Sequence, residues 1–266
     1  MATLKEIQVR LKSVSNIAKI TKSMKMIAST KVTKAQKLME TARSYGDSST
    51  ALYKHAETAG ESTKPLVIVV SSDRGLCGGI HSSVSKAAKR YINNKPEASI
   101  SVIGLKAKAQ MQRDNRQQIV ITFDQVAKNV PTWNEAALIA HEILSSGLEF
   151  DSIQVVYNQF KSVIAYEAQT VTVPSLQTFS ESPKLSAYEV ENPALQSYQE
   201  FSLANGLYWA LAEGYASEMA ARRTAMENAT KNAGEMIQKL TLTYNRSRQA
   251  AITNELIDII TGASAM

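Results

Sequence analysis

Apolar side chains in the first part of the chain recur at spacings of three and four residues, with mostly Lys, Ser, Thr and Gln between them. The stripe consists of Leu4, Ile7, Leu11, Val14, Ile17, Ile20, Met24 and Ile27. A stripe this narrow is typical of a coiled-coil seam, because a helix that covers a broad core shows a wider apolar face. We therefore predict a long helix over residues 1–60, with Gly46 as a possible weak point.

A second stripe of the same kind predicts another long helix over residues 203–262. Its members are Leu203, Leu207, Leu211, Ala212, Tyr215, Met219, Met226, Ala229, Ala233, Ile237, Leu240, Tyr244, Ile252, Leu256 and Ile259. All six prolines lie between the two stripes, and a proline inside a helix costs about 3 kcal/mol. Ala and Met dominate residues 216–233, so a partner helix can approach closely there. Two narrow stripes most economically bury each other as an antiparallel pair.

The region between the two stripes alternates strand and helix patterns. The expected strands are Leu66–Val70, Ser99–Ile103, Ile119–Phe123, Ile153–Tyr157 and Val163–Val173, the last two possibly joined as a hairpin. The expected helices are Ile80–Asn93, Lys106–Arg113 and Trp133–Leu144. This alternation predicts an α/β fold over residues 65–175, with helices on both faces of a small sheet. Residues 176–202 are largely polar without a clear period, and we expect them to form a connection.

The net charge of +6 belongs to one arm of the chain. Residues 1–43 hold ten Lys and Arg against two Glu, whereas residues 204–262 are neutral, with six basic and six acidic side chains. No aromatic residue in 1–44 is available to stack on a base or to anchor in a membrane surface. Attraction to an acidic protein surface therefore suits the basic helix best, and an ordinary solvated face is the alternative.

The composition argues against several classes of protein. No apolar run approaches the ~18 residues of a membrane span, so we expect a soluble protein without direct membrane insertion. A single cysteine excludes an internal disulfide, and three widely spaced histidines predict no metal site. The Lys-rich, Ser-rich start is similar to a transit peptide, but the pattern continues past Lys37 without a cleavage-like break. We interpret it as part of the mature protein, with any presequence already absent.

Three local motifs have chemical alternatives, and none is complete. The loop 71–79 carries three glycines after a strand, but its spacing matches neither a dinucleotide fingerprint nor a P-loop, so a tight turn is favoured over a nucleotide site. His141-Glu142 begins a zinc-protease motif, but Ser145 stands at the position of the second histidine. Cys77 has His81 nearby, and a structural thiol remains the favoured interpretation. We expect no catalytic residue, cofactor or metal.

Several longer strings resemble the γ subunits of F-type ATP synthases. They are ATLKEI at 2–7, RLKS at 10–13, NI at 16–17, KITKSMKM at 19–26, SSDRGLCG at 71–78, ARRTAMENATKNA at 221–233 and LTYNRSRQAAITNEL at 242–256. The resemblance covers essentially the whole chain and is strongest to the mitochondrial form, since the chloroplast form carries an inserted dithiol and this chain has only Cys77. The departures are mild: Ala251 replaces a more usual Val, and residues 174–193 follow no family pattern.

The resemblance implies a non-catalytic central rotor shaft: an antiparallel coiled coil on a Rossmann-like foot domain. Its implied partners are the hexamer of α and β subunits, the δ and ε subunits and the membrane c-ring, on the matrix side of the mitochondrial inner membrane. The family pattern also implies partner-contacting residues. These are Met24 with Lys22 and Lys25, facing an acidic β lever, and Arg248 with Gln249, which hydrogen-bond a β loop.

Two other classes remain as alternatives. A coiled-coil protein that binds nucleic acid through its basic arm would show strongly salt-dependent affinity for DNA. An α/β enzyme with helical extensions would bind nucleotide tightly as an isolated chain.

Overall fold

The computed structural model describes residues 3–56, 62–180, 182, 184 and 192–265. The chain forms two compact units: unit 1 contains residues 1–27 and 223–266, and unit 2 contains residues 28–222. Two long helices, α1 (Leu4–Ala56) and α6 (Asn192–Ser264), each contribute residues to both units. We describe the units separately.

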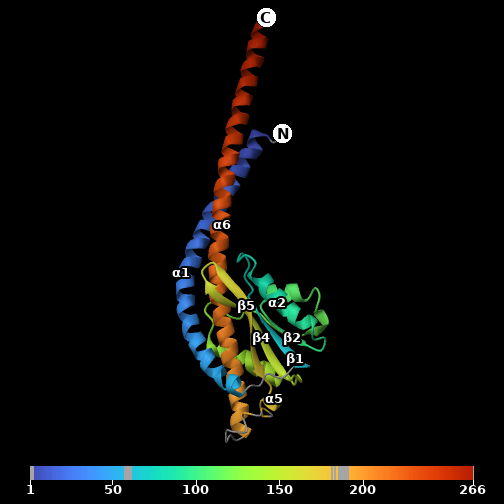
Figure 1. The fold of residues 1–266 in the computed structure, drawn as a ribbon. Helices are drawn as coiled ribbons and strands as arrows, with labels where there is room; N and C mark the ends of the chain where they lie inside the picture. The colour runs from blue at the N-terminus through green and yellow to red at the C-terminus, as the bar shows by residue number, and fades with distance from the viewer. Residues whose placement is uncertain (1–2, 57–61, 181, 183, 185–191, 266) are drawn as a thin grey trace. The chain divides into compact units, whose positions relative to one another are not determined.

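A five-stranded sheet forms the centre of unit 2 (Figure 1). The strands are β1 (Pro65–Val70), β2 (Ser99–Ile103), β3 (Ile119–Phe123), β4 (Ser152–Ser162) and β5 (Ala165–Pro174). Their order is β3-β2-β1-β4-β5, parallel except for β5, which pairs antiparallel with β4 as a hairpin. All five strands were predicted, and β4 extends five residues beyond its expected end because the hairpin pairs it with β5 to Ser162.

Helices cover both faces of the sheet, as the alternating pattern predicts. They are α2 (Ile80–Asn93), α3 (Leu105–Met111), the short 3-10 helix η1 (Arg116–Gln118), α4 (Trp133–Ser145) and α5 (Leu176–Ser180). The start of α4 is fixed by a capping box, in which Thr132 accepts from the Glu135 N–H and the Glu135 carboxylate accepts from the Thr132 N–H.

Alternating residues of the sheet bury against two different layers. Val67 and Val69 of β1 pack with α2 and α3 on one face. Leu66 and Ile68 face the other way, into a larger core with α4, α5 and segments of α1 and α6. Since both faces of β1 are covered, its continuous apolar run is explained.

In unit 2 the two long helices run antiparallel and pack on each other. Val32, Ala35 and Met39 of α1 form one buried cluster with Ala216 and Met219 of α6. Near the other end of the pair, Tyr198 donates a 2.7 Å hydrogen bond to the Ser49 carbonyl. Close approach is possible because α6 presents alanine, in agreement with the predicted contact region.

Unit 1 consists of the start of α1 and the end of α6, also antiparallel. Thr230 donates a 2.8 Å hydrogen bond to Thr21, and Lys25 forms a 2.7 Å ion pair with Glu227. Buried residues recur along α1 every seven positions: Ile7, Val14, Thr21, Ala28, Ala35 and Ala42. A strict seven-residue repeat is the signature of a left-handed coiled coil.

The predicted stripe is wrong in its second half. Ile17, Ile20 and Ile27 are 52%, 59% and 57% exposed. The seam instead passes one residue later, through partly buried Ala18 and buried Thr21. Both sets follow spacings of three and four, and small side chains lie in the seam because the two helices approach closely.

The helix boundaries differ from the expected ones at three places. Helix α6 begins at Asn192 instead of 203. Pro193 is compatible with this start, because N–H groups in the first turn of a helix have no acceptor within the helix. The expected connection 176–202 therefore contains α5 and the first turns of α6. Helix α1 continues through Gly46 and ends at Ala56, and the predicted residues 57–60 lie outside the described part.

Candidate functional site

The strand order creates a switch point beside β1, between neighbours β2 and β4. Doubly wound folds bind ligands in the crevice at the carboxyl ends of the strands at such a point. Here the loop 71–79 follows β1 and leads into α2. Gly104 makes this turn possible: a Cβ on it would lie 2.6 Å from the Ser72 nitrogen, and its φ of 96° suits glycine.

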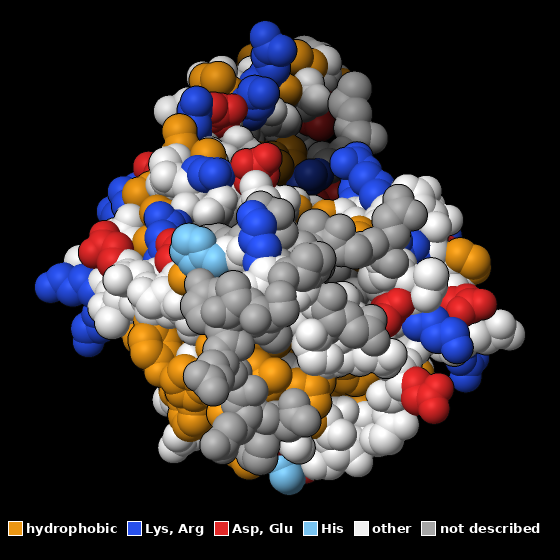
Figure 2. Space-filling model, turned by 60° about the horizontal axis from the view of Figure 1, so that its bottom comes forward, with side chains coloured by type: hydrophobic (Ala, Val, Ile, Leu, Met, Phe, Trp, Pro, Cys, Tyr) orange, Lys and Arg blue, Asp and Glu red, His pale blue; other side chains and the backbone are white. Residues whose placement is uncertain are grey.

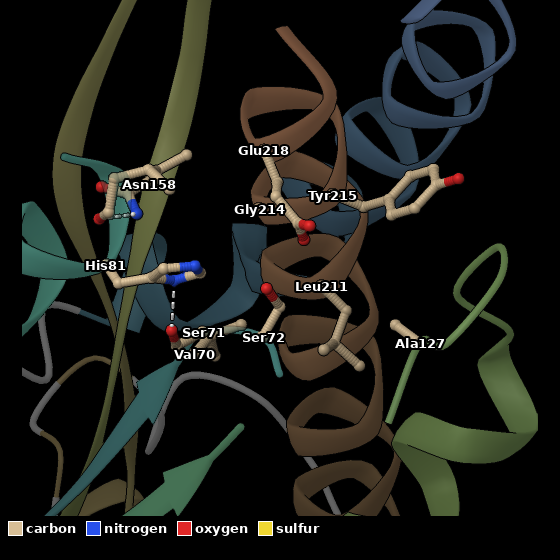
Figure 3. Close-up of a pocket in the computed structure, with 11 residues that line it drawn as sticks. Val70, Ser71, Ser72, His81, Ala127, Asn158, Leu211, Gly214, Tyr215 and Glu218 are labelled. Carbon is tan, nitrogen blue, oxygen red and sulfur yellow. Dashed lines mark hydrogen bonds between the residues drawn. The ribbon is translucent and has the colours of Figure 1, made fainter. Parts of the chain in front are cut away.

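Helix α6 fills this crevice in place of a ligand (Figure 3). Leu211, Gly214, Tyr215 and Glu218 of α6 line what remains, a cavity of about 30 Å³. Small-molecule sites usually occupy about 300–1,000 Å³. The space left at the switch point is therefore too small for a nucleotide.

The glycine loop is fixed by contacts within unit 2. Asp73 accepts hydrogen bonds of 2.8 Å from the N–H groups of Leu105 and Gln125. From α6, Arg222 donates to the Gly75 carbonyl at 3.3 Å and pairs with Glu218 at 2.5 Å. Asp73 thus fixes the loop to the neighbouring segments, and α6 holds the loop by a contact that the sequence did not indicate.

Cys77 is part of a buried hydrogen-bonding cluster. Its sulfur lies 2.9 Å from His81 Nε2, which is also 2.9 Å from the Arg74 carbonyl, while His81 Nδ1 lies 2.8 Å from Ser71 Oγ. Burial raises the pKa of the Cys77 thiol to about 11, with the Glu218 charge acting in the same direction. A neutral thiol is a poor nucleophile, so the cluster suits a structural role.

A fully buried carboxylate joins both long helices to the sheet within unit 2. Glu213 of α6 accepts from Arg43 Nε of α1 at 2.7 Å, from the Phe160 N–H of β4 at 2.8 Å and from Trp209 Nε1 at 3.2 Å. Arg43 also donates to the Phe160 carbonyl at 3.1 Å. The hydrogen bond and charge of Glu213 raise the pKa of Arg43, outweighing its partial burial. We call these four residues the Glu213 clamp.

Sequence reasoning missed the Glu213 clamp. Arg43 and Glu213 are 170 residues apart, and neither belongs to a motif. The available signal was weak: Glu213 lies between the stripe residues Ala212 and Tyr215. A Glu that is buried there needs a partner.

The predicted N-terminal contact residues lie together in unit 1. Lys22 is exposed, whereas Met24 and Lys25 are partly buried. The carboxylate of Glu227 lies 2.7 Å from Lys25 Nζ, and this contact lowers the pKa of Glu227. Lys25 is therefore engaged by its own chain.

Arg248 and Gln249 form a separate patch on α6. Both are exposed, and they lie about 21 residues beyond Glu227 along the same helix, or roughly 30 Å at ~1.5 Å per residue. The structure does not bring the two predicted contact groups together.

Unit 1 exposes an unusual amount of apolar surface for a helical pair. Its exposed large apolar residues are Val9, Ile17, Ile20, Met26, Ile27, Met236, Leu242, Ile252, Leu256, Ile257, Ile259 and Ile260. Exposed apolar surface often marks protein contacts where it is contiguous. Unit 2 has its own groove of about 770 Å³ between α4 and the first turns of α6, lined among others by Trp133, Leu144 and Phe201.

Charges elsewhere are mixed. On the face shown in Figure 2, basic and acidic side chains are interspersed, while hydrophobic side chains gather in one patch at its lower left. His141 and Glu142 lie exposed on α4, as expected for an ordinary helix surface. Among the described residues, no cluster of His, Cys, Asp and Glu could hold a metal ion. None of the described helices is long and apolar enough to cross a membrane.

Two long paired helices and a mostly parallel α/β sheet, whose crevice at the switch point is occupied by one of the helices, define the class of protein. A family model described as ATP synthase matches residues 3–266. The chain is 48% identical to "ATP synthase subunit gamma, mitochondrial" of Pichia angusta and 48% identical to the mitochondrial F(1) complex subunit gamma of Rattus norvegicus, with all of each chain covered. The chain belongs to the family of ATP synthase gamma subunits.

Solved structures agree with this assignment. A chain of the central stalk and c-ring structure of Tetrahymena thermophila mitochondrial ATP synthase matches at 27% identity and a TM-score of 0.69, covering 79% of this chain and 99% of that one. A chain of Euglena gracilis mitochondrial ATP synthase matches at 20% identity and a TM-score of 0.81, covering 99% and 94%, which shows a shared fold.

Proposed function

We propose that this chain is the central rotor shaft of a mitochondrial F-type ATP synthase, coupling rotation of the membrane c-ring to ATP synthesis and hydrolysis at the β subunits. The observation that carries the proposal is the full-length 48% identity to two mitochondrial gamma subunits. The chain is a component of an enzyme complex and is itself non-catalytic. It works at the matrix side of the inner membrane, held there by the complex.

Its partners are the hexamer of α and β subunits, the δ and ε subunits and the c-ring. Support comes from the match to a chain of the central stalk and c-ring structure of Tetrahymena thermophila mitochondrial ATP synthase. The exposed apolar residues of unit 1 fit a helical pair that is enclosed by other subunits.

The fold suits transmission of torque. A twisting force on the helical pair reaches the sheet through buried polar contacts as well as through apolar packing, because the Glu213 clamp joins α1, α6 and β4. Buried polar contacts are directional, so they resist sliding more than apolar contacts do.

The contact residues in unit 1 are proposed in two groups. Lys22, Met24 and Lys25 face an acidic lever of the β subunit, and Arg248 with Gln249 hydrogen-bond a β loop. The exposure of Lys22, Arg248 and Gln249 supports their availability to a partner. Lys25 already forms an ion pair with Glu227, so a partner carboxylate would have to compete with Glu227 for it.

A non-catalytic role is supported by the filled crevice and by the raised pKa of Cys77. Calorimetry of the purified chain with Mg-ATP should detect no binding in the micromolar range. A micromolar constant that is lost on changing Gly78 or Gly79 would overturn this part of the proposal.

A rotation assay tests the shaft role directly. The full chain is assembled with α and β subunits of a mitochondrial ATP synthase, fixed through β to a surface, and labelled with a bead at an introduced cysteine in unit 2 after Cys77→Ser. ATP should drive unidirectional rotation of the bead. An assembled complex that hydrolyses ATP while the bead stays still would refute the proposal.

A further inference from the structure

The cavity at the switch point contains polar atoms that no side chain satisfies. It lies between the end of β1, the middle of β4 and α6, and its lining includes Ser72, Asn158 and Glu218. Ser72 Oγ and Asn158 Oδ1 are buried and have no hydrogen-bond partner, although Asn158 Nδ2 donates to the Ile80 carbonyl at 3.1 Å. Asn158 is only 4% exposed.

Buried polar atoms in proteins nearly always have a partner, because an unpaired one loses its hydration without compensation. Neighbouring groups are engaged elsewhere: Ser71 pairs with His81, and Arg222 holds Glu218. Figure 3 shows Ser72, His81 and Glu218 directed toward a common space from three elements of unit 2. A small polar molecule in that space can reach atoms that no side chain reaches.

The cavity volume suits one occupant. It measures about 30 Å³, and a site needs roughly 10–15 Å³ and two to four polar partners to hold a water molecule. We propose that this cavity binds one ordered water molecule. The water donates a hydrogen bond to Asn158 Oδ1 and forms a second one with Ser72 Oγ, and Glu218 lines the same cavity. The water bridges β4 and the segment after β1 on the side of the cavity that faces α6.

The site is independent of the proposed function, since it uses only contacts inside unit 2. A structure of the assembled complex containing the full chain, at better than about 2 Å, is the first test. A density peak within hydrogen-bonding distance of both Asn158 Oδ1 and Ser72 Oγ is expected. A resolved cavity without a peak, or a peak with the short, multiple oxygen contacts of a metal cation, would overturn the proposal.

A pair of glycine variants gives a second test in solution. A Cβ at Gly214 would lie 3.8 Å from Val70 Cγ1, and one at Gly206 would lie 3.9 Å from Val173 Cγ2, both ordinary contacts. Both glycines are in α6, but only Gly214 lines the cavity. Gly214→Ala therefore takes up space in the cavity, and Gly206→Ala is its matched control for helix propensity.

If the cavity holds water, the added methyl group displaces it and leaves Asn158 Oδ1 unpaired. Gly214→Ala should then unfold at a lower temperature than Gly206→Ala, and its density peak should disappear. A dry cavity predicts the opposite order, because the methyl group would fill empty space, and that order would refute the proposal. Ser72→Ala, which removes one of the two polar partners, should lower the occupancy of the peak.

Discussion

The same two helices are held together in different ways in the two units. In unit 2 they are fixed by a fully buried carboxylate, a glycine in contact with a tryptophan ring, and a sheet packed against them. In unit 1 their contacts include a partly buried Thr21–Thr230 hydrogen bond and an exposed ion pair, and isoleucines of α1 face outward. Unit 2 therefore carries its own stabilising contacts, whereas unit 1 leaves many large apolar side chains exposed.

The largest expected effect on stability comes from comparing one glutamate substitution in each unit. Glu213→Ala removes the acceptor of three hydrogen bonds. The Arg43 guanidinium, the Phe160 N–H and Trp209 Nε1 then lose their shared partner. Breaking such a buried pair should destabilise unit 2 by about 3 kcal/mol. Glu227→Ala removes an exposed partner and should leave unfolding by urea unchanged. Equal midpoints for the two variants would contradict the comparison.

Glycine-to-alanine substitutions should have opposite signs in the two units. A Cβ at Gly46 in unit 2 would lie 2.7 Å from the Trp209 ring, so Gly46→Ala should destabilise by about 1–3 kcal/mol despite better helix propensity. Gly234 in unit 1 has no atom within 4 Å of such a Cβ, so Gly234→Ala should stabilise by up to about 1 kcal/mol. Thermal unfolding of both variants measures the difference. Destabilisation by Gly234→Ala would contradict the open surroundings of Gly234 and the difference between the two units.

This comparison also explains which features the sequence predicted. The strands and the shorter helices follow from apolar runs and capping residues, and Ile80–Asn93, Ser99–Ile103 and Ile119–Phe123 have their expected bounds. Those elements depend on patterns that can be read within a short stretch of sequence. The start of α6 was wrong because a proline in a first turn and a proline outside a helix look alike in the sequence.

The candidate site was only partly predictable. The seam between Val14 and Ala28 was misplaced by one residue, since Ile17 and Ile20 satisfy the same spacing as Ala18 and Thr21. Apolar residues that stay exposed cannot be told from seam residues by spacing alone. The Glu213 clamp and the water cavity depend on contacts between distant segments, which no spacing rule indicates.

Arg248 and Gln249 test whether unit 1 is completed by partners. Replacing both by Ala should leave unfolding of the isolated chain unchanged, because both are exposed there. If the two residues contact a β loop in the assembled complex, as proposed, the lost charge-assisted hydrogen bond is worth about 1.5–3 kcal/mol, and coupling of ATP synthesis to rotation should weaken. Rates of synthesis and hydrolysis in the reconstituted complex measure this. Normal rates at normal assembly would show that the residues were assigned wrongly.

Acid should weaken one contact of unit 2 in a defined pH range. Burial tends to raise the pKa of Asp151, but hydrogen bonds from Ser62, Thr63 and Lys64 outweigh it and bring the pKa to about 2 from 3.8. The stabilisation is therefore present above about pH 4 and is lost as the pH falls through 2. The difference in unfolding midpoint between the native chain and Asp151→Asn should shrink over that range. A constant difference would mean that these hydrogen bonds do not depend on the charge.

The smallest effects are expected from the lysines of unit 1. Each exposed pair with an acidic partner is worth at most about 1 kcal/mol and is screened within about 8 Å at physiological salt, so single replacements of Lys19, Lys22 or Lys25 by Gln should be nearly silent. The triple replacement changes the field over more than one helical turn and should alter torque or turnover more than any single one.

Glu227 provides the internal control for this last prediction. Because Lys25 is paired with Glu227, the double replacement Lys25→Gln with Glu227→Gln leaves the local net charge unchanged and should match the native chain. Single-molecule rotation over a salt series separates the contributions, since an effect of charge must shrink as the ionic strength rises. An effect of the triple replacement that does not depend on salt would instead assign the contact to packing around Met24, and unit 1 would then meet its partner through apolar surface alone.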